Sequence, residues 1–260
     1  MPPEPTLEDE WYKMLTEGEP INRHLYHLYG LLPSDPRCKL CAAPFRGLGG
    51  FLMHLLGRDQ SRYNPRFCQK CEVFEHPGGA EVPLTMLFAD VRGSTTLAEK
   101  MSAREFSRLI NRFYSVASHV LIQTDAMVDR LLGDEAIGLY IPGFTGPEHS
   151  RKAVEAAQDL LRLTGHGDAK GPWLPVGIGV HTGSAYVGVV GDEGSTADFT
   201  ALGDNVNITA RLASEAGSGE ILISDAAYEA AKLDLRELEH RQLELKGKSE
   251  PIGVHILRLE

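Results

Sequence analysis

From Val82 to residue 259, short apolar segments of strand length alternate with segments of helical spacing, and this alternation constrains the fold more than any other feature. Val82–Val91 is a nearly continuous apolar run, short enough for a buried strand. The segments that follow predict the order strand, helix, two strands, helix, strand, with further strands and helices after them. This order predicts an α+β fold with the helices on one face of a sheet.

Local signals set the bounds of these elements. Residues 102–105 form a capping box, with apolar residues at helical spacing after it. A second capping box at 145–148 predicts a helix through about Leu163, which Gly165 ends. The remaining predictions are strands at 127–132, 136–141, 176–181, 185–190, 221–223, 237–245 and 252–259, and helices at 204–215 and 225–232.

The residues before 82 have a different composition. Residues 7–31 form a weakly amphipathic helical pattern that Gly18-Glu19-Pro20 interrupts. Residues 33–80 are rich in Gly, Pro, Arg and Cys, and His76-Pro77-Gly78-Gly79 is typical of a linker. We therefore predict a helical segment at 1–36, a cysteine-rich module with a linker at 37–80, and a main domain at 81–260.

The charge of the chain is unevenly distributed. The net charge of −10 argues against binding of nucleic acid or an anionic membrane by the whole chain. Residues 37–70, however, carry 7 basic and 1 acidic side chains. This basic island could bind an acidic partner, nucleic acid or lipid headgroups. Alternatively, four of its arginines pair with the acidic main domain: Arg46, Arg58, Arg62 and Arg66.

Two features bear on localisation. The acidic N-terminus lacks the basic and then apolar pattern of a secretory signal peptide. The longest stretch without Asp, Glu, Lys or Arg is 171–191, and its six glycines and two prolines favour a β-hairpin over a membrane helix. We therefore expect a cytoplasmic chain without a transmembrane segment.

The four cysteines form two CxxC pairs with 26 residues between them. Paired motifs of this kind place four thiolates around Zn²⁺, although an iron–sulfur cluster uses the same ligands and redox dithiols are a further alternative. Disulfides are disfavoured in the cytosol. We expect residues 51–56 to pack into the small core of this module, with His54 outside the metal site. The predicted zinc ligands are Cys38, Cys41, Cys68 and Cys71.

Two aspartates lie where predicted strands end. Asp90 closes the strand 82–91 and leads into a Gly-Ser-Thr turn. A carboxylate there can hold a hard cation while turn N–H groups face phosphate oxygens. Asp134 lies at the tip of the 127–141 hairpin. Ordinary turns also favour aspartate at such positions. On neighbouring strand ends, however, two carboxylates could hold the paired Mg²⁺ ions of phosphoryl transfer.

A polar pair lies on the predicted helix 204–215. Asn207 and Arg211 are four residues apart, so both project from one face. Such a pair is often a solvated surface. The functional alternative is that the arginine stabilises charge on a transferring phosphoryl group.

The order of the motifs is more specific than any one of them. Along residues 82–260 the chain carries FADVRGST, RLLGDEAIGLY, VGIGVHTGSAYVGVVG, TALGDNVNITARL and LELKGK. This series resembles the catalytic domain of class III adenylate/guanylate cyclases. The resemblance implies a ferredoxin-like α+β palm that dimerises head to tail, with composite active sites at the interface.

The resemblance also implies a role for each matching residue. Asp90 and Asp134 match the metal-binding aspartates, which hold two Mg²⁺ or Mn²⁺ ions, and Val91 adds a backbone carbonyl. Asn207 would orient the ribose and Arg211 would stabilise the pentacovalent phosphorus. In the family these two residues, with the phosphate-binding lysine, come from the partner chain. The positions that match phosphate-binding residues are Gly93, Ser94, Thr95 and Lys246.

The implied reaction forms 3′,5′-cyclic AMP and pyrophosphate from ATP, through attack of the ribose 3′-oxygen on the α-phosphate in a homodimer. The base-binding positions depart from the family pattern. Arg130 stands where adenylate cyclases usually have lysine, whereas Thr200 fits a bacterial adenylate cyclase. Apart from the base, Gly177 stands where vertebrate forms have an arginine that contacts phosphate, so this chain lacks that phosphate contact. A guanylate or pyrimidine cyclase and a non-catalytic nucleotide-sensing domain are therefore alternatives.

Overall fold

The computed structural model describes residues 6–20, 23–33, 35–61, 65–72, 78–191, 198–233 and 238–259. The chain divides into two compact units. The first unit comprises Met1–Val82, Pro142–Phe144 and Tyr186–Leu202, and the second comprises Pro83–Ile141, Thr145–Ala185 and Gly203–Glu260. Within the described ranges, none of the helices has both the length and the apolar character needed to cross a membrane.

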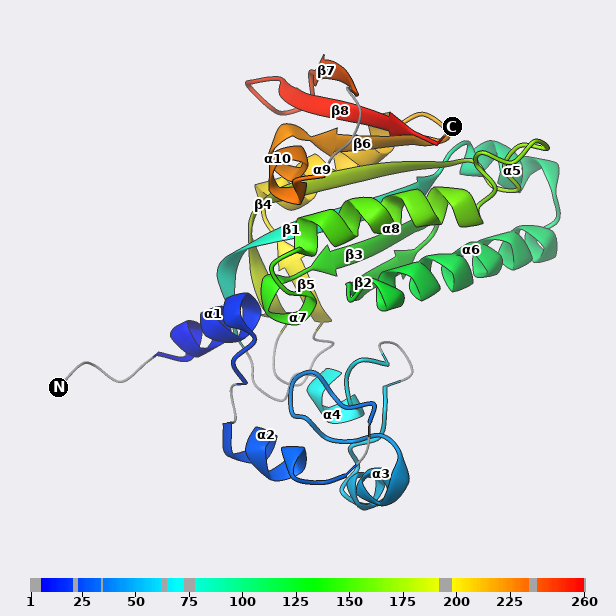
Figure 1. The fold of residues 1–260 in the computed structure, drawn as a ribbon. Helices are drawn as coiled ribbons and strands as arrows, with labels where there is room; N and C mark the ends of the chain where they lie inside the picture. The colour runs from blue at the N-terminus through cyan, green and yellow to red at the C-terminus, as the bar shows by residue number, and fades with distance from the viewer. Residues whose placement is uncertain are drawn as a thin grey trace. The chain divides into compact units, whose positions relative to one another are not determined.

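One eight-stranded sheet is formed by the described residues (Figure 1). The strands are ordered β2-β3-β1-β4-β6-β8-β7, with β5 paired to β4. The pair β4–β6 is parallel, whereas β1–β3, β2–β3, β4–β5, β6–β8 and β7–β8 are antiparallel. The strands are β1 (Gly79–Val91), β2 (Met127–Leu132), β3 (Glu135–Tyr140), β4 (Val176–Val190), β5 (Asp198–Leu202), β6 (Glu220–Ser224), β7 (Glu239–Leu243) and β8 (Ile252–Arg258).

Helices cover both faces of the sheet in the second unit, which corrects the expectation that they lie on one face. The helices are α5 (Ser94–Lys100), α6 (Ala103–Gln123), α8 (His149–Leu163), α9 (Asp204–Glu215) and α10 (Asp225–Ala231). Ile221 and Ile223 of β6 pack in one core cluster with α6, α8 and α10, whereas Leu222 packs in another with α9. Successive side chains of a strand point to opposite faces, so an Ile-Leu-Ile strand needs apolar cover on both.

The two predicted capping boxes have different outcomes. Before α6, the Glu105 N–H donates to Ser102 Oγ at 3.3 Å and the Glu105 carboxylate accepts from the Ser102 N–H at 2.9 Å, which confirms the first box. The second box is wrong. Glu148 precedes α8 without a side-chain cap, and Thr145, the last residue of α7 (Pro142–Thr145), donates to the Asp125 carbonyl at 2.9 Å.

The two strands predicted at 176–181 and 185–190 are one continuous strand, β4. Its first part pairs with β6 and its last part with β5. Gly183 is not a turn residue here. A Cβ at this position would lie 2.5 Å from the Asn205 side chain, so the glycine allows α9 to approach the strand. Asn205 Nδ2 in turn donates to the Ser184 carbonyl at 2.7 Å.

The first unit contains the N-terminal helices. These are α1 (Leu7–Glu17), α2 (Arg23–Gly30), α3 (Gly47–Leu55) and α4 (Gln69–Glu72). The predicted interruption is confirmed, because α1 ends at Gly18, whose φ of 74° is left-handed and favours glycine. Trp11, Met14 and Leu15 are buried on one side of α1. The Trp11 ring stacks against Phe199 of β5 with centroids 6.1 Å apart.

Candidate functional site

The two predicted metal-binding acids lie side by side where β1 ends. Asp90 is the penultimate residue of β1, and it pairs across the sheet with Glu135 of β3. Asp134 immediately precedes Glu135, and the Val91 N–H donates to the Asp134 carbonyl at 3.0 Å. The structure therefore brings together Asp90, Val91 and Asp134, which are the three residues predicted to hold metal.

The start of α5 borders this acid cluster of Asp90, Asp134 and Glu135. The Ser94 hydroxyl donates to Asp134 Oδ2. Gly93 has a φ of 67°, a left-handed conformation that lets the chain turn directly from β1 into the helix. Thr95 follows and is exposed. Because the N–H groups of a first helical turn have no helical partner, residues 93–95 present donors beside the two acids.

The acid cluster has a strong excess of negative charge. Burial raises the pKa of Asp90, the Arg92 guanidinium opposes this shift, and the Asp134 carboxylate adds to it. Arg92 forms an ion pair with Asp90 and also donates to the Ser214 carbonyl at 2.6 Å. Its Nε is buried and has no partner among the described residues. Arg92 is therefore the close counter-charge of this half-buried carboxylate.

Glu135 is a third acid of the cluster, and sequence reasoning missed it. Burial raises the pKa of Glu135, and the Asp90 and Asp134 carboxylates raise it further. Its sequence signal is weak, because it lies next to Asp134 in the hairpin but opposite Asp90 only once β3 pairs with β1.

Helix α9 presents Asn207 and Arg211 as potential ligand-binding groups. The neighbouring Asn205 is occupied, since its Oδ1 lies 2.9 Å from His181 Nε2. Asn207 is exposed and Arg211 is half-buried. Among the described residues neither side chain makes a hydrogen bond or an ion pair. Both therefore retain their full capacity to bind a ligand.

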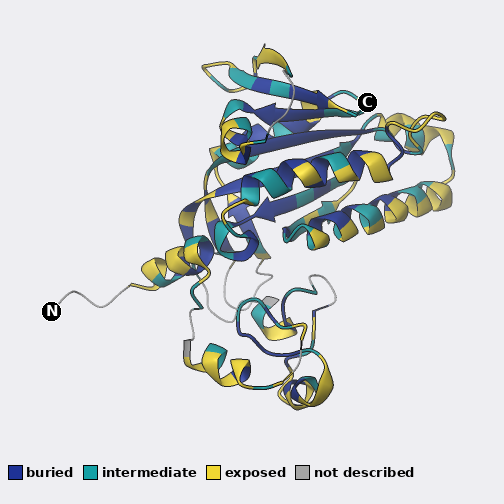
Figure 2. Ribbon diagram, viewed as in Figure 1, coloured by how far each residue is buried: buried dark blue, intermediate teal, exposed yellow. Residues whose placement is uncertain are grey.

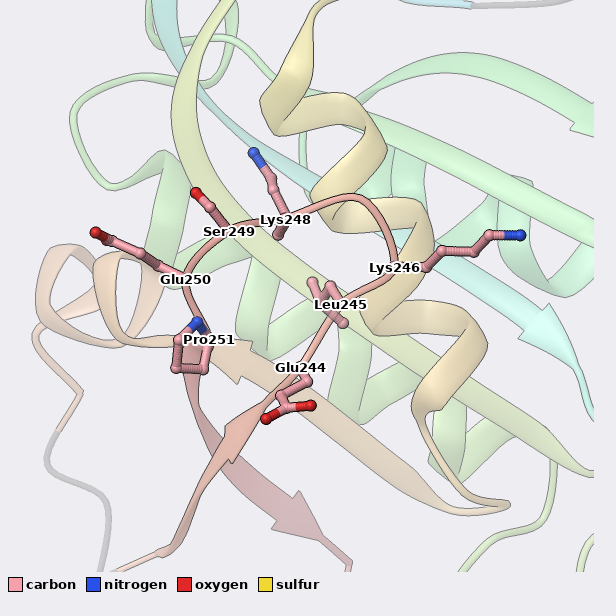
Figure 3. Close-up of a pocket in the computed structure, with 7 residues that line it drawn as sticks. All are labelled: Glu244, Leu245, Lys246, Lys248, Ser249, Glu250 and Pro251. Carbon is pink, nitrogen blue, oxygen red and sulfur yellow. The ribbon is translucent and has the colours of Figure 1, made fainter.

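The loop between β7 and β8 carries Lys246 beside α9 (Figure 3). Lys248 of this loop forms an ion pair with Asp204 at the start of α9, whereas Lys246 is exposed. A Cβ at Gly247 would lie 3.4 Å from Arg211 Nη2, so the loop passes close to the arginine. The loop lines a cavity of about 440 Å³ with Glu244, Leu245, Lys246, Lys248, Ser249, Glu250 and Pro251.

The positions predicted to bind the base lie in different units. Arg130 is exposed on β2, beside a shift in the β2–β3 register, and belongs to the second unit. Thr200 is buried on β5 and belongs to the first. Gly177 lies against the end of α9, where a Cβ would be 2.5 Å from the Ala216 carbonyl. The close packing of β4 and α9 thus leaves no room at this position for the arginine of vertebrate forms.

The four cysteines come together in the first unit. Their sulfur atoms lie within 4.8 Å of one another, with 3.8 Å between the sulfurs of Cys41 and Cys68, and no disulfide joins them. A tetrahedral zinc ion with Zn–S bonds of about 2.3 Å separates its sulfurs by about 3.8 Å. The spacing therefore fits a four-thiolate metal site.

Hydrogen-bond donors surround these sulfurs. The Cys68 N–H donates to Cys38 Sγ at 3.3 Å, and the Cys71 N–H donates to Cys68 Sγ at 3.4 Å. Hydrogen bonds from Cys38 and then Cys41 hold the pKa of the Cys68 thiol below its usual range. Arg58 Nη1 lies 3.7–3.8 Å from the sulfurs of Cys41, Cys68 and Cys71. Donors of this kind stabilise thiolates and orient metal ligands.

The position of Arg58 corrects the alternative in which it pairs with the acidic main domain. Its side chain is buried against the sulfurs and lies over the Tyr29 ring, 5.2 Å from its centroid. Arg37 likewise donates within the unit, to the carbonyls of Tyr29 and Ala42. The Arg58 charge thus lies beside the cysteine sulfurs and not at the surface of the main domain. Arg62 lies outside the described residues.

Residues 51–56 do not pack into the small core as expected. Met53 is buried, but most of α3 faces solvent (Figure 2). The cysteines and Phe67 already fill this core, so the helix contributes only one side to it. His54 is exposed and lies 2.7 Å from Asp59, consistent with its expected place outside the metal site. The exposed apolar residues are Leu48, Phe51, Leu52, Leu55 and Leu56.

Comparisons with known proteins match the larger part of the chain. Residues 80–258 match the family described as "Adenylate and Guanylate cyclase catalytic domain". An adenylate cyclase of Anabaena cylindrica is 29% identical over 183 residues, which cover 66% of this chain. The same alignment covers 36% of that protein, so this chain spans only about a third of the relative's length.

Solved cyclase structures have the same fold. The crystal structure of the guanylyl cyclase Cya2 is 27% identical, with a TM-score of 0.62 over 69% of this chain and 93% of that chain. The adenylyl cyclase CyaB from P. aeruginosa is 26% identical, with a TM-score of 0.62 over 70% of this chain and 97% of that chain. The mixed α+β palm predicted from the sequence is thereby confirmed. The chain belongs to the class III adenylate/guanylate cyclase catalytic domain family.

Proposed function

We propose that residues 81–260 form a catalytic domain that converts ATP to 3′,5′-cyclic AMP and pyrophosphate. The helical segment at 1–36 and the cysteine-rich module at 37–80 precede it. The observation that carries the proposal is the closeness of Asp90 and Asp134, fixed by the hydrogen bond from the Val91 N–H to the Asp134 carbonyl and bordered by Ser94. Two adjacent carboxylates beside a helical turn with free N–H groups suit a triphosphate and its cations.

The acid cluster fits two Mg²⁺ or Mn²⁺ ions. Its donors are carboxylate and carbonyl oxygens, which these hard cations prefer, and they would come from Asp90, Asp134 and Val91. Burial raises the pKa of Asp90 despite the nearby Arg92 guanidinium, and a bound cation would favour its charged form. When bound, the ions would neutralise the triphosphate and favour ionisation of the ribose 3′-hydroxyl.

The remaining groups would bind and orient the nucleotide. Arg211, which has no partner among the described residues, would stabilise charge at the α-phosphorus while pyrophosphate leaves. Asn207, one turn earlier, would orient the ribose. Lys246 and residues 93–95 would hold the phosphates.

We propose that the active form is a homodimer in which the acid cluster of one chain meets α9 and Lys246 of the other. The family resemblance implies this arrangement. Within each chain, the ion pair of Lys248 with Asp204 joins the loop to α9, so Lys246 and Arg211 would reach the nucleotide of the other chain together.

ATP is the proposed substrate, and GTP or a pyrimidine nucleotide is the second candidate. Thr200 and the adenylate cyclase relatives favour ATP. Arg130 keeps a pyrimidine nucleotide as an alternative, because its planar guanidinium differs in shape and hydrogen bonding from the lysine usual in adenylate cyclases. A guanylate cyclase would more naturally carry an acid at this position.

The decisive experiment incubates the purified full chain with each of the four nucleoside triphosphates and Mn²⁺, and identifies the products by mass. Cyclic AMP should predominate. Asp90→Asn and Asp134→Asn should each lower turnover by at least about 100-fold, as expected when a group that stabilises the transition state is lost. Asp159→Asn, an exposed aspartate of α8, is the control. Unchanged turnover in either active-site variant would contradict the proposal, and nucleotide binding without product would favour the sensor alternative.

We also propose that the cysteine cluster binds Zn²⁺. The support is the sulfur spacing, the two amide donors and the buried Arg58, which offsets the charge of four thiolates. Metal analysis of the purified chain should find zinc that a Cys38→Ser/Cys68→Ser variant lacks. Iron together with acid-labile sulfide would instead identify an iron–sulfur cluster.

A further inference from the structure

A second group of potential metal ligands lies away from the acid cluster and the cysteines. His240 of β7 and His255 of β8 are direct partners in the antiparallel β7–β8 pair. Asp225, the first residue of α10, meets both of them. Each of the three residues is 15 positions from the next in the chain, and no sequence motif marks them. Two histidines and one aspartate from three elements therefore converge within the second unit.

The distances within this group are close to those around a bound metal ion. Asp225 Oδ1 lies 2.9 Å from His240 Nε2 and 3.3 Å from His255 Nε2. The donor atoms of all three residues lie within 4.8 Å of one another. An ion with bonds of about 2.0–2.2 Å to nitrogen and oxygen in tetrahedral geometry separates its ligands by about 3.3–3.5 Å. Small side-chain adjustments would therefore suffice to admit one.

The surrounding residues hold these ligands in place. The Tyr228 ring stacks on His255 with centroids 3.8 Å apart and planes at 15°. A Cβ at Gly253 would lie 2.0 Å from Asp225 Oδ2, so a larger residue at this position of β8 would displace the carboxylate. The orientation of metal ligands by such neighbours is a general feature of metal sites.

The chemistry of the three side chains also suits a divalent cation. A neutral imidazole offers a lone pair to a metal. The Asp225 carboxylate adds a negative charge, which attracts a divalent ion.

We propose that Asp225, His240 and His255 form a site for a divalent transition metal of the zinc class. Imidazole and carboxylate donors suit Zn²⁺, and three protein ligands leave one position for water. The ion would join β7, β8 and α10. It would thereby link β7 to β8, the two strands that flank the loop with Lys246.

The test uses the full chain with its cysteine cluster already filled by one equivalent of Zn²⁺, in excess Mg²⁺. Calorimetric titration with further Zn²⁺ should show one additional binding event per chain. His240→Gln and His255→Gln should each weaken this event at least about tenfold, because loss of a ligand should exceed the 10- to 100-fold effect of losing a supporting residue. His119→Gln, an exposed histidine of α6, should bind as the unchanged chain does.

Two results of the calorimetric titration would overturn the proposal. One is the absence of the additional event in the unchanged chain, and the other is its persistence in the His240→Gln/His255→Gln variant. A second measurement needs no variant. In zinc-soaked crystals of the unchanged chain, an anomalous peak among the three side chains would support the site, whereas zinc at the cysteine cluster alone would contradict it.

Discussion

Glu135 lies directly opposite Asp90 in the β1–β3 pair, so two carboxylates share the end of one strand pair, and Asp134 adds a third. Burial raises the pKa of both Asp90 and Glu135, and the neighbouring acids raise each further. The three carboxylates therefore repel one another when no cation lies between them.

Glu135→Gln should stabilise the chain at neutral pH in buffer without Mg²⁺ or Mn²⁺. A carboxyl with a raised pKa in the folded state contributes stability below its unfolded pKa and loses it as the pH rises through its folded pKa. Glutamine does not ionise, so at pH 7 the variant should have a higher free energy of unfolding than the unchanged chain. The difference should be less than about 1 kcal/mol, because solvent screens a half-exposed group. The gain should shrink towards about pH 4, near the ordinary carboxyl pKa. Urea unfolding at both pH values measures it.

The control for this prediction is Glu99→Gln, an exposed residue of α5. Its stability should follow that of the unchanged chain at both pH values. A Glu135→Gln variant that is less stable at pH 7 would mean that the carboxylate has a stabilising partner rather than repelling neighbours.

Arg58→Gln should weaken zinc binding by the cysteine cluster by about 10- to 100-fold, the usual effect of removing a residue that supports metal ligands. Arg58 Nη1 contacts three of the sulfurs, and its charge offsets that of the thiolates. Competition with a chromophoric chelator measures the affinity. Arg46→Gln, at an exposed position before α3 without a side-chain cap bond, is the matched control. Equal zinc affinities in the two variants would mean that Arg58 packs against the sulfurs without supporting metal binding.

Mixing inactive chains should restore activity if each site is shared between two chains. Asp90→Asn inactivates the acid cluster of one chain, and Arg211→Ala inactivates α9 of the other. A mixed dimer therefore keeps one intact site, formed by the acids of the Arg211→Ala chain and α9 of the Asp90→Asn chain. Random exchange at equal concentrations should recover roughly a quarter of the unchanged activity, because half of the dimers are mixed and each has one of two sites. Turnover after confirmed subunit exchange measures it, and no recovery would place the whole site in one chain.

Gly247→Val should reduce cyclase turnover through Arg211. The Gly247 φ of 78° makes valine strained, and its side chain would press on a guanidinium that lies 3.4 Å from the Cβ position. We expect a loss of at least about tenfold, since a misplacement of 1 Å can cost about 100-fold. Gly171→Val is the matched control, because Gly171 has a φ of 74° and no atom within 4 Å of its Cβ position. Equal turnover in both variants would mean that the loop does not position Arg211.

Short-range patterns predicted the elements well where the residues involved are close in sequence. The Ser102–Glu105 capping box, the end of α1 at Gly18 and the position of Asp90 at the end of β1 all follow from local backbone chemistry. The capping box predicted at Thr145 was wrong, because the Thr145 hydroxyl donates to the Asp125 carbonyl. Asp125 lies 20 residues earlier and comes close only when the chain folds.

The sequence by itself therefore determined the α+β class, the ends of several elements and the motifs that resemble a cyclase. Only the tertiary structure placed Glu135 opposite Asp90, Arg58 against the sulfurs, and Asp225 beside two histidines. It also decided that α9 covers the second face of the sheet. The physical reason is that periodicity and caps act within a few residues, whereas strand register and the packing of distant segments depend on the whole chain.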